Sequence, residues 1–271
     1  MSYVSLTPLD IVFAAALLIA NGAISWGFRL GLEKSIAIAA ARMVVQLALI
    51  GVVLKFIFVQ TSPAWTLAFA LVMVVAAGTE VVARQHRGFA GWRTFGLSTG
   101  TLLFIGTLVT VLGVGAIITP DPWYSPRYVL PILGMVLGNT MTAVALVLDR
   151  LNEAASRERN AIEARLALGA RRFEALASPL QTALRTGMMP MLNAMATTGL
   201  VALPGMMTGQ IIAGADPVGA AKYQMLIMFL ISGATALGSF LAAVGGVMLL
   251  TDERHRLRRD TGPGAKENAR S

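Results

Sequence analysis

The sequence predicts an all-α membrane protein with about seven transmembrane helices, and three observations lead to this fold class. Hydrophobic residues make up 56% of the 271 residues, and charged residues make up only 13%. The mean hydropathy of +0.69 is far from that of a soluble globular domain. The apolar residues form runs of about 20, the length that a helix needs to cross a bilayer, and not the alternating segments of a β-barrel.

Seven apolar runs mark the expected spans, and the charges between them predict an orientation. The runs cover roughly residues 8–28, 36–59, 64–82, 97–118, 128–148, 187–209 and 223–250. Of the 22 Lys and Arg residues, only Lys55, Arg127 and Lys222 fall on one side of this arrangement. Because cytoplasmic loops carry the excess of Lys and Arg, we expect the N-terminus outside and the C-terminus in the cytoplasm. The same asymmetry accounts for the net charge of +8 without a nucleic-acid partner.

The spans and the polar segments suggest a simple domain organisation. Residues 1–250 form a transmembrane domain, with one sizeable cytoplasmic segment at 150–185, and residues 251–271 form a basic flexible tail. His86 and His255 both fall among arginines in segments expected in the cytoplasm, and no cluster of His, Asp and Glu has the spacing of metal ligands. Cys is absent, which excludes disulfides and thiolate metal sites. We therefore expect neither catalytic residues nor a cofactor bound by this chain.

The cytoplasmic segment 150–185 predicts a short, rigid helix. Asn160 is the expected N-cap, and Glu163 is placed to reach back to it as in a capping box. Gly169 is the expected left-handed stop. Ile162 and Leu166 between them form an apolar stripe, so this helix either docks a partner or lies on the membrane surface.

A second amphipathic segment follows this helix. It covers residues 171–177, and Pro179 is expected to separate it from the sixth apolar run.

The cytoplasmic segment also resembles a known element. Glu163 and Ala164, followed at a distance by Gly169, resemble the EAA loop of ATP-binding-cassette importer permeases, although Arg165 departs from that consensus. Four longer stretches are similar to the FetB-type permease family of bacterial iron export and plant aluminium tolerance. They are RMVVQLALIGVVLKFIF (42–58), VLPILGMVLGNTMTAVAL (129–146), ARLALGARRFEA (164–175) and GLVALPGMMTGQIIAGADPVGAAKYQ (199–224).

The resemblance implies a permease subunit in the inner (plasma) membrane that works with a separate ATPase. The chain has no G-x-x-x-x-G-K-[ST] loop for nucleotide phosphates, so ATP and Mg²⁺ are expected on the partner. The resemblance further implies a homodimer in the lipid bilayer and iron as the exported cargo. The expected ATPase-coupling residues are Asn160, Glu163, Ala164, Leu166, Gly169 and Phe173.

A helix break is expected in the sixth span. The uncharged run 186–215 would extend about 45 Å as one straight helix, which is about half longer than the hydrocarbon core. Breaking is easiest at Pro204 and Gly205, and we expect the break near the outer leaflet, facing protein or a cavity. The residues assigned to the break and a possible path are Pro204, Gly205, Met206, Met207, Gly209 and Gln210.

Small, soft and polar residues within the spans allow two interpretations each. Met206 and Met207 either fill gaps in the core or line a cation path. Gly205 and Gly209 form a small-xxx-small pair for close helix approach across a homodimer axis; the same spacing recurs at Gly27/Gly31, Gly96/Gly100 and Gly134/Gly138 in a chain of 27 glycines, so one instance carries little weight. The intramembrane polar residues either bond between helices or offer oxygen to a cation; they are Gln46, Glu80, Asn139 and Asn193. Glu80 precedes Arg84 by four residues, which favours an ion pair.

Three functions remain open from the sequence. The first is the permease subunit of an ATP-driven metal exporter, and the second is a stand-alone secondary metal-cation carrier or channel. The third is a non-transporting membrane scaffold. The spans contain no recognisable ligand cage that would select one metal, so the cargo follows only from the resemblance.

Overall fold

The structure is a computed structural model that describes residues 7–60, 62–85, 91–252 and 256–257. The chain forms two compact units, which we call the N-terminal hairpin (residues 1–61) and the bundle (residues 62–271). Within the described residues, six helices are long and apolar enough to cross a membrane. The expected class, a multi-pass helical membrane protein, is confirmed, and the orientation of the termini stays a prediction. His86, His255 and most of the expected tail lie outside the described residues.

The N-terminal hairpin consists of α1 (Pro8–Gly27) and α2 (Glu33–Gln60). Ser25 organises the turn between them, because its hydroxyl accepts a hydrogen bond from the Leu32 amide at 3.1 Å and its carbonyl accepts one from Leu30. Gly31 lies in this turn with a φ of 69°. Gly27 and Gly31 are therefore not on one helix, and their spacing does not make a helix-packing pair.

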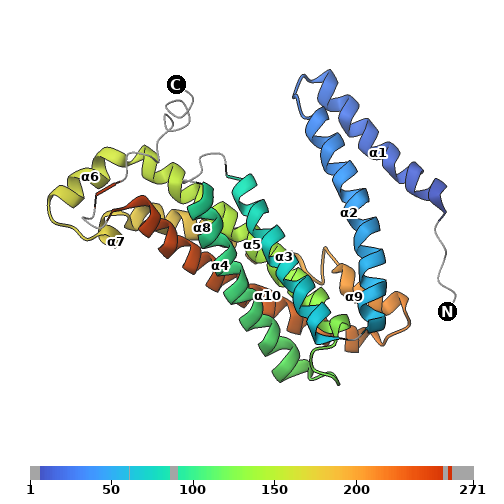
Figure 1. The fold of residues 1–271 in the computed structure, drawn as a ribbon. Coiled ribbons are helices and arrows are strands. Elements are labelled where there is room, and N and C mark those ends of the chain that lie inside the picture. The colour runs from blue at the N-terminus through green and yellow to red at the C-terminus, as the bar shows by residue number, and fades with distance from the viewer. Residues whose placement is uncertain (1–6, 61, 86–90, 253–255, 258–271) are drawn as a thin grey trace. The chain divides into compact units, whose positions relative to one another are not determined.

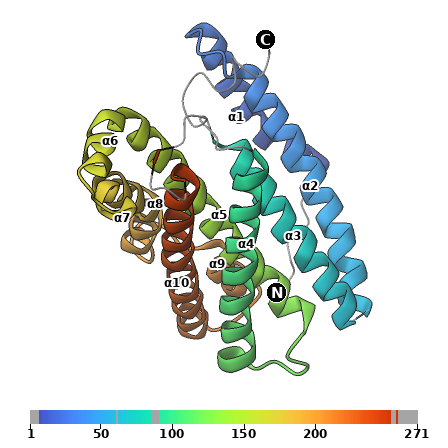
Figure 2. The same ribbon diagram turned by 60° about the vertical axis from the view of Figure 1, so that its left-hand side comes forward.

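The bundle contains the remaining helices, and α5 lies at its centre. Helices α10, α8, α3 and α4 all pack against α5, and Figures 1 and 2 show these helices running alongside one another. In chain order the elements are α3 (Pro63–Ala83), α4 (Gly91–Thr110), the π-helix η1 (Val111–Ile118), α5 (Pro126–Arg157), α6 (Arg159–Ala167), α7 (Arg172–Ala175), α8 (Ala177–Thr197), α9 (Gly205–Ile212) and α10 (Pro217–Leu250).

Six of the seven expected spans match helices, and the sixth span does not. The run at 187–209 is divided between α8, which already begins at Ala177, and the short α9. Pro179 lies in the first turn of α8, where a proline is tolerated because the first amide groups of a helix have no partner within it. The expectation that Pro179 separates two segments is therefore wrong.

Close helix crossings in the bundle depend on glycine. A Cβ atom on Gly187 of α8 would overlap Cγ2 of Val147 on α5, and one on Gly238 of α10 would overlap Cγ2 of Thr140 on α5. Small residues let helices gain packing contacts in lipid, where burial of apolar surface gives little driving force.

The glycines at these crossings are not the expected ones. Several members of the expected small-xxx-small pairs would meet no atom within 4 Å if they carried a Cβ; they are Gly96, Gly100, Gly138, Gly205 and Gly209. Gly134 is different, since a Cβ there would lie 3.2 Å from Cε of Met73.

Two hydrophobic clusters form the core of the bundle. In the first cluster, Ile162 of α6 and Leu176 pack with Leu151 of α5 and Leu250 of α10. These parts of α5 and α10 are the ends expected at the cytoplasmic side. The second cluster lies toward the other end of α10, around Ile227. It also includes Met191 of α8. Helices α8 and α10 contribute to both clusters and so connect the two ends of the bundle.

Candidate functional site

Residues 158–176 form a compact projection that we call the foot. It contains α6, the turn after it and α7, and it lies at the end of the bundle remote from α9 (Figure 1). The segment assigned to this region on sequence, 150–185, is longer. Its first residues belong to α5 and its last residues to α8, so the connection between the long helices is only the foot.

The start of α6 differs from the expected capping box. Helix α5 continues to Arg157, and Glu158 occupies the N-cap position of α6 without a capping hydrogen bond from its side chain. Asn160 therefore lies inside the first turn, exposed, and does not act as N-cap. The Glu163 carboxylate pairs with the Arg159 guanidinium at 2.8 Å instead of reaching back to Asn160.

The end of α6 is the expected glycine stop. Gly169 has a φ of +94°, its amide donates to the Leu166 carbonyl at 3.1 Å, and the Ala170 amide donates to the Arg165 carbonyl at 3.0 Å. These two bonds form a Schellman motif, which satisfies carbonyls at the helix end and requires the left-handed conformation that glycine adopts easily. The chain therefore reverses sharply from α6 into α7.

The foot is held to the bundle by its apolar residues. Ile162, Ala175 and Leu176 are each 0% exposed and belong to the first core cluster. The Arg165 guanidinium donates to the Ala175 carbonyl at 3.3 Å and so ties α6 to α7. Because the bundle covers Ile162, the centre of the apolar stripe is not available to a membrane surface. The alternative of a surface-lying amphipathic helix loses its main support.

The outer face of the foot keeps exposed apolar side chains among charges. Leu168 is 88% exposed and Phe173 is 38% exposed, and Ala164 is also exposed while Leu166 is half-buried. Glu153, at the end of α5 beside the foot, pairs with Arg150 and Arg157, each at 2.6 Å. Leu168 is thus a single exposed leucine among charged residues, and its role in docking a partner stays a prediction.

Helix α8 leads from the foot directly to the break. It begins after the buried Leu176 and ends at Thr197. Its 21 residues extend about 31 Å at 1.5 Å per residue. Helix α8 therefore joins the foot to the break, and it contains Pro190 in its interior.

The break covers residues 198–204 and has defined geometry. Gly199 has a φ of +90°, and its amide donates to the Ala202 carbonyl at 2.9 Å. Pro204 caps α9, and its carbonyl accepts from both the amide and the hydroxyl of Thr208. Leu200 and Val201 at the tip are 93% and 84% exposed. The chain is thus interrupted beside Pro204 and Gly205, and their role in a path stays a prediction.

The residues after the break have different surroundings. Met206 packs against the second core cluster, whereas Met207 lines a cavity of about 470 Å³ between the end of α8, the break, α9 and α10. Gly209 is exposed, and Gln210 is half-buried with a side-chain oxygen that has no hydrogen-bond partner.

Several lining residues were missed on sequence, among them Gln224, Met225 and Met228. Gln224 of α10 also lines this cavity and is 6% exposed. Its place at the first residues of an apolar run was the available signal.

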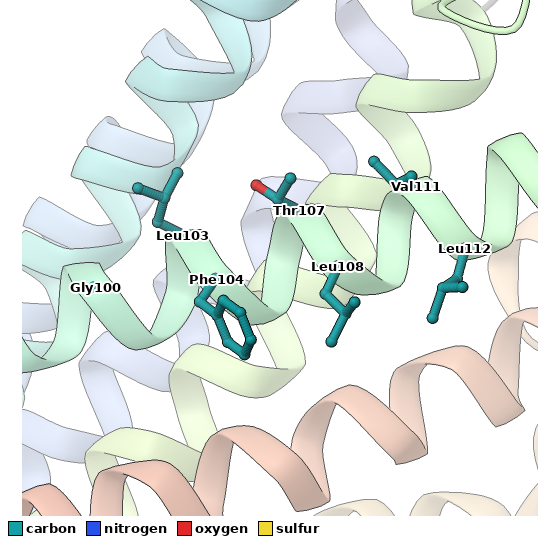
Figure 3. A pocket seen from close by; sticks show the side chains of 7 residues that line it. All are labelled: Gly100, Leu103, Phe104, Thr107, Leu108, Val111 and Leu112. Carbon is teal, nitrogen blue, oxygen red and sulfur yellow. The ribbon is translucent and has the colours of Figure 1, made fainter.

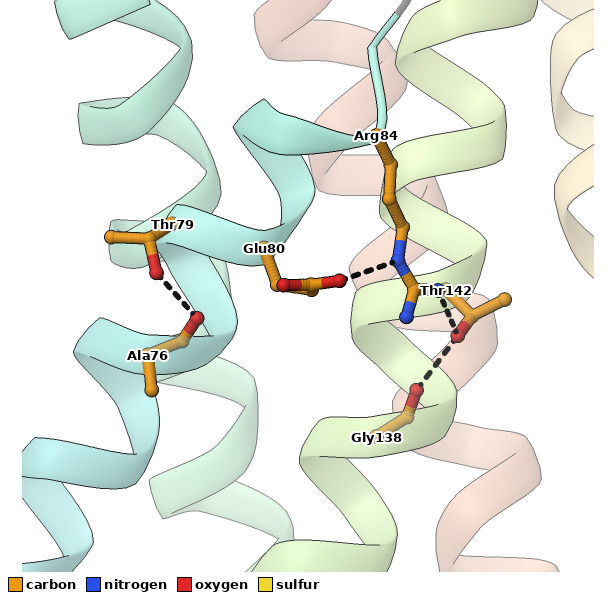
Figure 4. Close-up of polar contacts among 6 residues, drawn as sticks. All are labelled: Ala76, Thr79, Glu80, Arg84, Gly138 and Thr142. Atoms are coloured by element: carbon orange, nitrogen blue, oxygen red, sulfur yellow. Dashed lines mark hydrogen bonds and ion pairs between the residues drawn. The ribbon is translucent and has the colours of Figure 1, made fainter. Parts of the chain in front are cut away.

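The intramembrane polar residues have separate local surroundings. Glu80 pairs with Arg84 at 3.3 Å, as the spacing predicts, and Arg84 also contacts the Thr142 hydroxyl on α5 at 3.4 Å (Figure 4). Asn139 is exposed and donates to the Met135 carbonyl of its own helix at 2.9 Å. The expected bond from Asn139 to another helix is therefore not formed. Gln46 of α2 and Asn193 of α8 are exposed.

Two further hollows are apolar. One of about 560 Å³ runs along a single face of α4 and the start of η1, from Gly100 to Leu112 (Figure 3). Another of about 360 Å³ lies between α3, α4 and α5, with Trp123 and Tyr124 at its edge. Among residues 7–60, 62–85, 91–252 and 256–257, no group of three or more His, Asp or Glu is placed to hold a metal ion.

Comparison with known proteins gives family matches over most of the chain. Residues 8–249 match the group described as "Uncharacterised protein family (UPF0014)". The chain is 39% identical to the UPF0014 membrane protein slr1647 of Synechocystis, over 74% of this chain and 77% of that protein. It is 34% identical to Protein ALUMINUM SENSITIVE 3 of Arabidopsis thaliana, over 83% and 81% of the two chains. It is 31% identical to the probable iron export permease protein FetB of Escherichia coli, over 93% and 95%. Comparison with solved structures gave no significant match.

Proposed function

The chain belongs to the UPF0014 family of membrane proteins, and on that premise we propose that it is the permease subunit of an ATP-binding-cassette exporter of metal cations. The observation that carries the proposal is the continuity from foot to break. The foot presents exposed Leu168 on the face expected in the cytoplasm, and α8 leads from the foot to the interruption at 198–204.

In this proposal an ATPase subunit binds the foot and moves it during the ATP cycle. The buried Ile162 and Leu176 transmit that movement to the first core cluster, and α8 and α10 carry it toward the break. The break is the flexible point because proline cannot donate the next helical hydrogen bond and Gly199 holds a left-handed turn. Two copies of the chain, with two ATPase subunits, enclose the path.

Cargo and direction rest on the relatives. One relative is named a probable iron export permease and another is named for aluminium sensitivity. Both names concern metal cations, so iron is the first cargo to test. The membrane is the plasma membrane of a bacterial cell or its equivalent.

The test is co-purification followed by transport. The chain is purified from its native membranes with any bound ATPase, and the pair is reconstituted in liposomes for ATP-driven Fe²⁺ flux. Gly169→Pro is expected to uncouple ATP hydrolysis from flux, because proline is restricted to a φ near −65° and Gly169 has a φ of +94° with a bonded amide. The control is Gly96→Ala, at a glycine with open space on α4 and outside the foot and the break. If no ATPase co-purifies and Gly169→Pro transports normally, the proposal is refuted.

A stand-alone carrier is the second candidate function. It would need a titratable group within the membrane, and Glu80 is the carboxylate placed in a long span, although it is already paired with Arg84. Flux driven by a proton gradient without ATPase, and abolished by Glu80→Gln, would favour the carrier. A scaffold, the third alternative, predicts that Pro204→Ala combined with Gly205→Ala preserves function.

A further inference from the structure

The cavity beside the break collects methionines from three helices. Met195 lies near the end of α8, Met207 on α9, and Met225 and Met228 stand three residues apart on α10. Residues three apart lie on the same face of a helix. The tertiary structure therefore brings thioethers from distant parts of the chain to one cavity of about 470 Å³.

These methionines are only partly used for packing. Met195 is 37% exposed and Met225 is 52% exposed, and Met207 is half-buried. Met228 has contacts with the second core cluster and also faces the cavity. Met206, next in sequence to Met207, packs against the core and does not line the cavity. Core filling accounts for Met206 but not for Met195, Met207 and Met225, which line the cavity.

A buried amide completes the lining. Gln224 is 6% exposed, and its side-chain oxygen is buried without a hydrogen-bond partner. An unsatisfied buried acceptor costs about 1–3 kcal/mol, and a ligand in the cavity would offset that cost. Gln224 and the methionines therefore line the same cavity.

The donor set determines which ligand suits the cavity. Among the described residues that line it, none is charged and none is a histidine. Hard divalent cations such as Mg²⁺ and Ca²⁺ favour carboxylates and multiple oxygens, whereas thioether sulfur favours soft ions such as Cu(I). An uncharged pocket also suits a single positive charge better than a double one, because no carboxylate compensates the lost hydration.

We propose that this cavity binds a soft monovalent metal ion, with thioether sulfurs of Met195, Met207 and Met225 and the amide oxygen of Gln224 as ligands. The inference deepens the proposed function because it names the class of cargo that would bind in this cavity, at the end of the bundle remote from the foot. It rests on that function only for the role of the ion as cargo, since binding itself requires no ATPase.

The test measures Ag⁺, a redox-stable probe for Cu(I), on the full chain in nanodiscs without ATPase. Isothermal titration is expected to give one site per chain. The triple variant Met195→Leu, Met207→Leu and Met225→Leu should weaken Ag⁺ binding by about tenfold or more, in the range found when metal-site groups are removed. Leu and Met have similar volumes, so melting of the metal-free protein should change little.

The matched control replaces three exposed methionines that do not line the cavity. Met43, Met189 and Met248 are 51–52% exposed, and changing all three to Leu should leave Ag⁺ affinity unchanged. A second variant, Gln224→Leu, removes the unsatisfied acceptor. The metal-free protein should melt at the same or a higher temperature, while the rise in melting temperature caused by Ag⁺ should shrink.

Three results would overturn the proposal: no Ag⁺ site in the wild type, equal losses in the two triple variants, or Fe²⁺ binding tighter than Ag⁺ with the same methionine dependence. Failure of the proposed function gives a different pattern. If no ATPase co-purifies but Ag⁺ binds through the lining methionines, the site stands and the exporter does not. If ATP drives Fe²⁺ flux but Ag⁺ does not bind, the exporter stands and the site does not.

Discussion

The exposed leucine at the tip of the foot offers a quantitative test of ATPase docking. Leu168 is 88% exposed, so nearly all of its side chain would lose water contact under a docked subunit. Leu168→Ala removes three carbons, and at about 0.8 kcal/mol per buried methylene the loss is about 2 kcal/mol. Since each 1.4 kcal/mol is tenfold in affinity, we expect ATPase binding to weaken about 30-fold.

The assay compares two leucines of equal chemistry at opposite ends of the bundle. The chain in nanodiscs is titrated with the co-purified ATPase by biolayer interferometry. Leu200→Ala, at a residue that is 93% exposed in the break, is the control and should leave the affinity unchanged. Folding should be intact in both variants, because neither side chain is buried. Equal affinity for Leu168→Ala and wild type, or an equal loss in both variants, would refute docking through the foot.

Three further predictions concern the scaffold. Ile162→Ala should destabilise the bundle by about 2–5 kcal/mol because this side chain is 0% exposed, measured by thermal melting of tryptophan fluorescence; an unchanged melting temperature would mean that the foot is not packed on the core. Gly187→Ala should cost about 1–3 kcal/mol through overpacking against Val147, and tolerance of the new methyl in the same assay would contradict the close crossing. Gly169→Ala should cost about 1–2 kcal/mol through its φ of +94° and speed hydrogen exchange within 158–176 alone; slow exchange there would argue against the left-handed stop.

The helices that hydropathy predicts well are those whose whole length is apolar. Six expected spans coincide with helices, and the family resemblance based on the LPGMMTG block (203–209) is confirmed. The sixth run was placed too late because the first turns of α8 carry Gln181 and Arg185, which lower local hydropathy without interrupting the helix. Helix continuity depends on backbone hydrogen bonds, and these tolerate polar side chains outside the hydrocarbon region.

Local motifs were only partly predictable in the foot. Gly169 behaves as expected because a left-handed stop is a property of a few adjacent residues. Asn160 does not cap α6, since α5 extends to Arg157 and leaves Glu158 in the capping position. Where α5 ends depends on Leu151 and Ala155 packing in the core, and no window around Asn160 contains that information.

Hydropathy and local turn chemistry are properties of contiguous residues, so they already indicate a multi-pass helical membrane protein, the course of most of its helices and its family. The contacts of individual residues follow from the packing of the helices and could not be predicted in this way. Gly187 meets Val147, Ile162 is enclosed by the core, and Met207 faces a cavity with Gln224 while Met206 does not. These contacts join residues on different helices, and the angles and depths at which the helices cross determine which side chains meet.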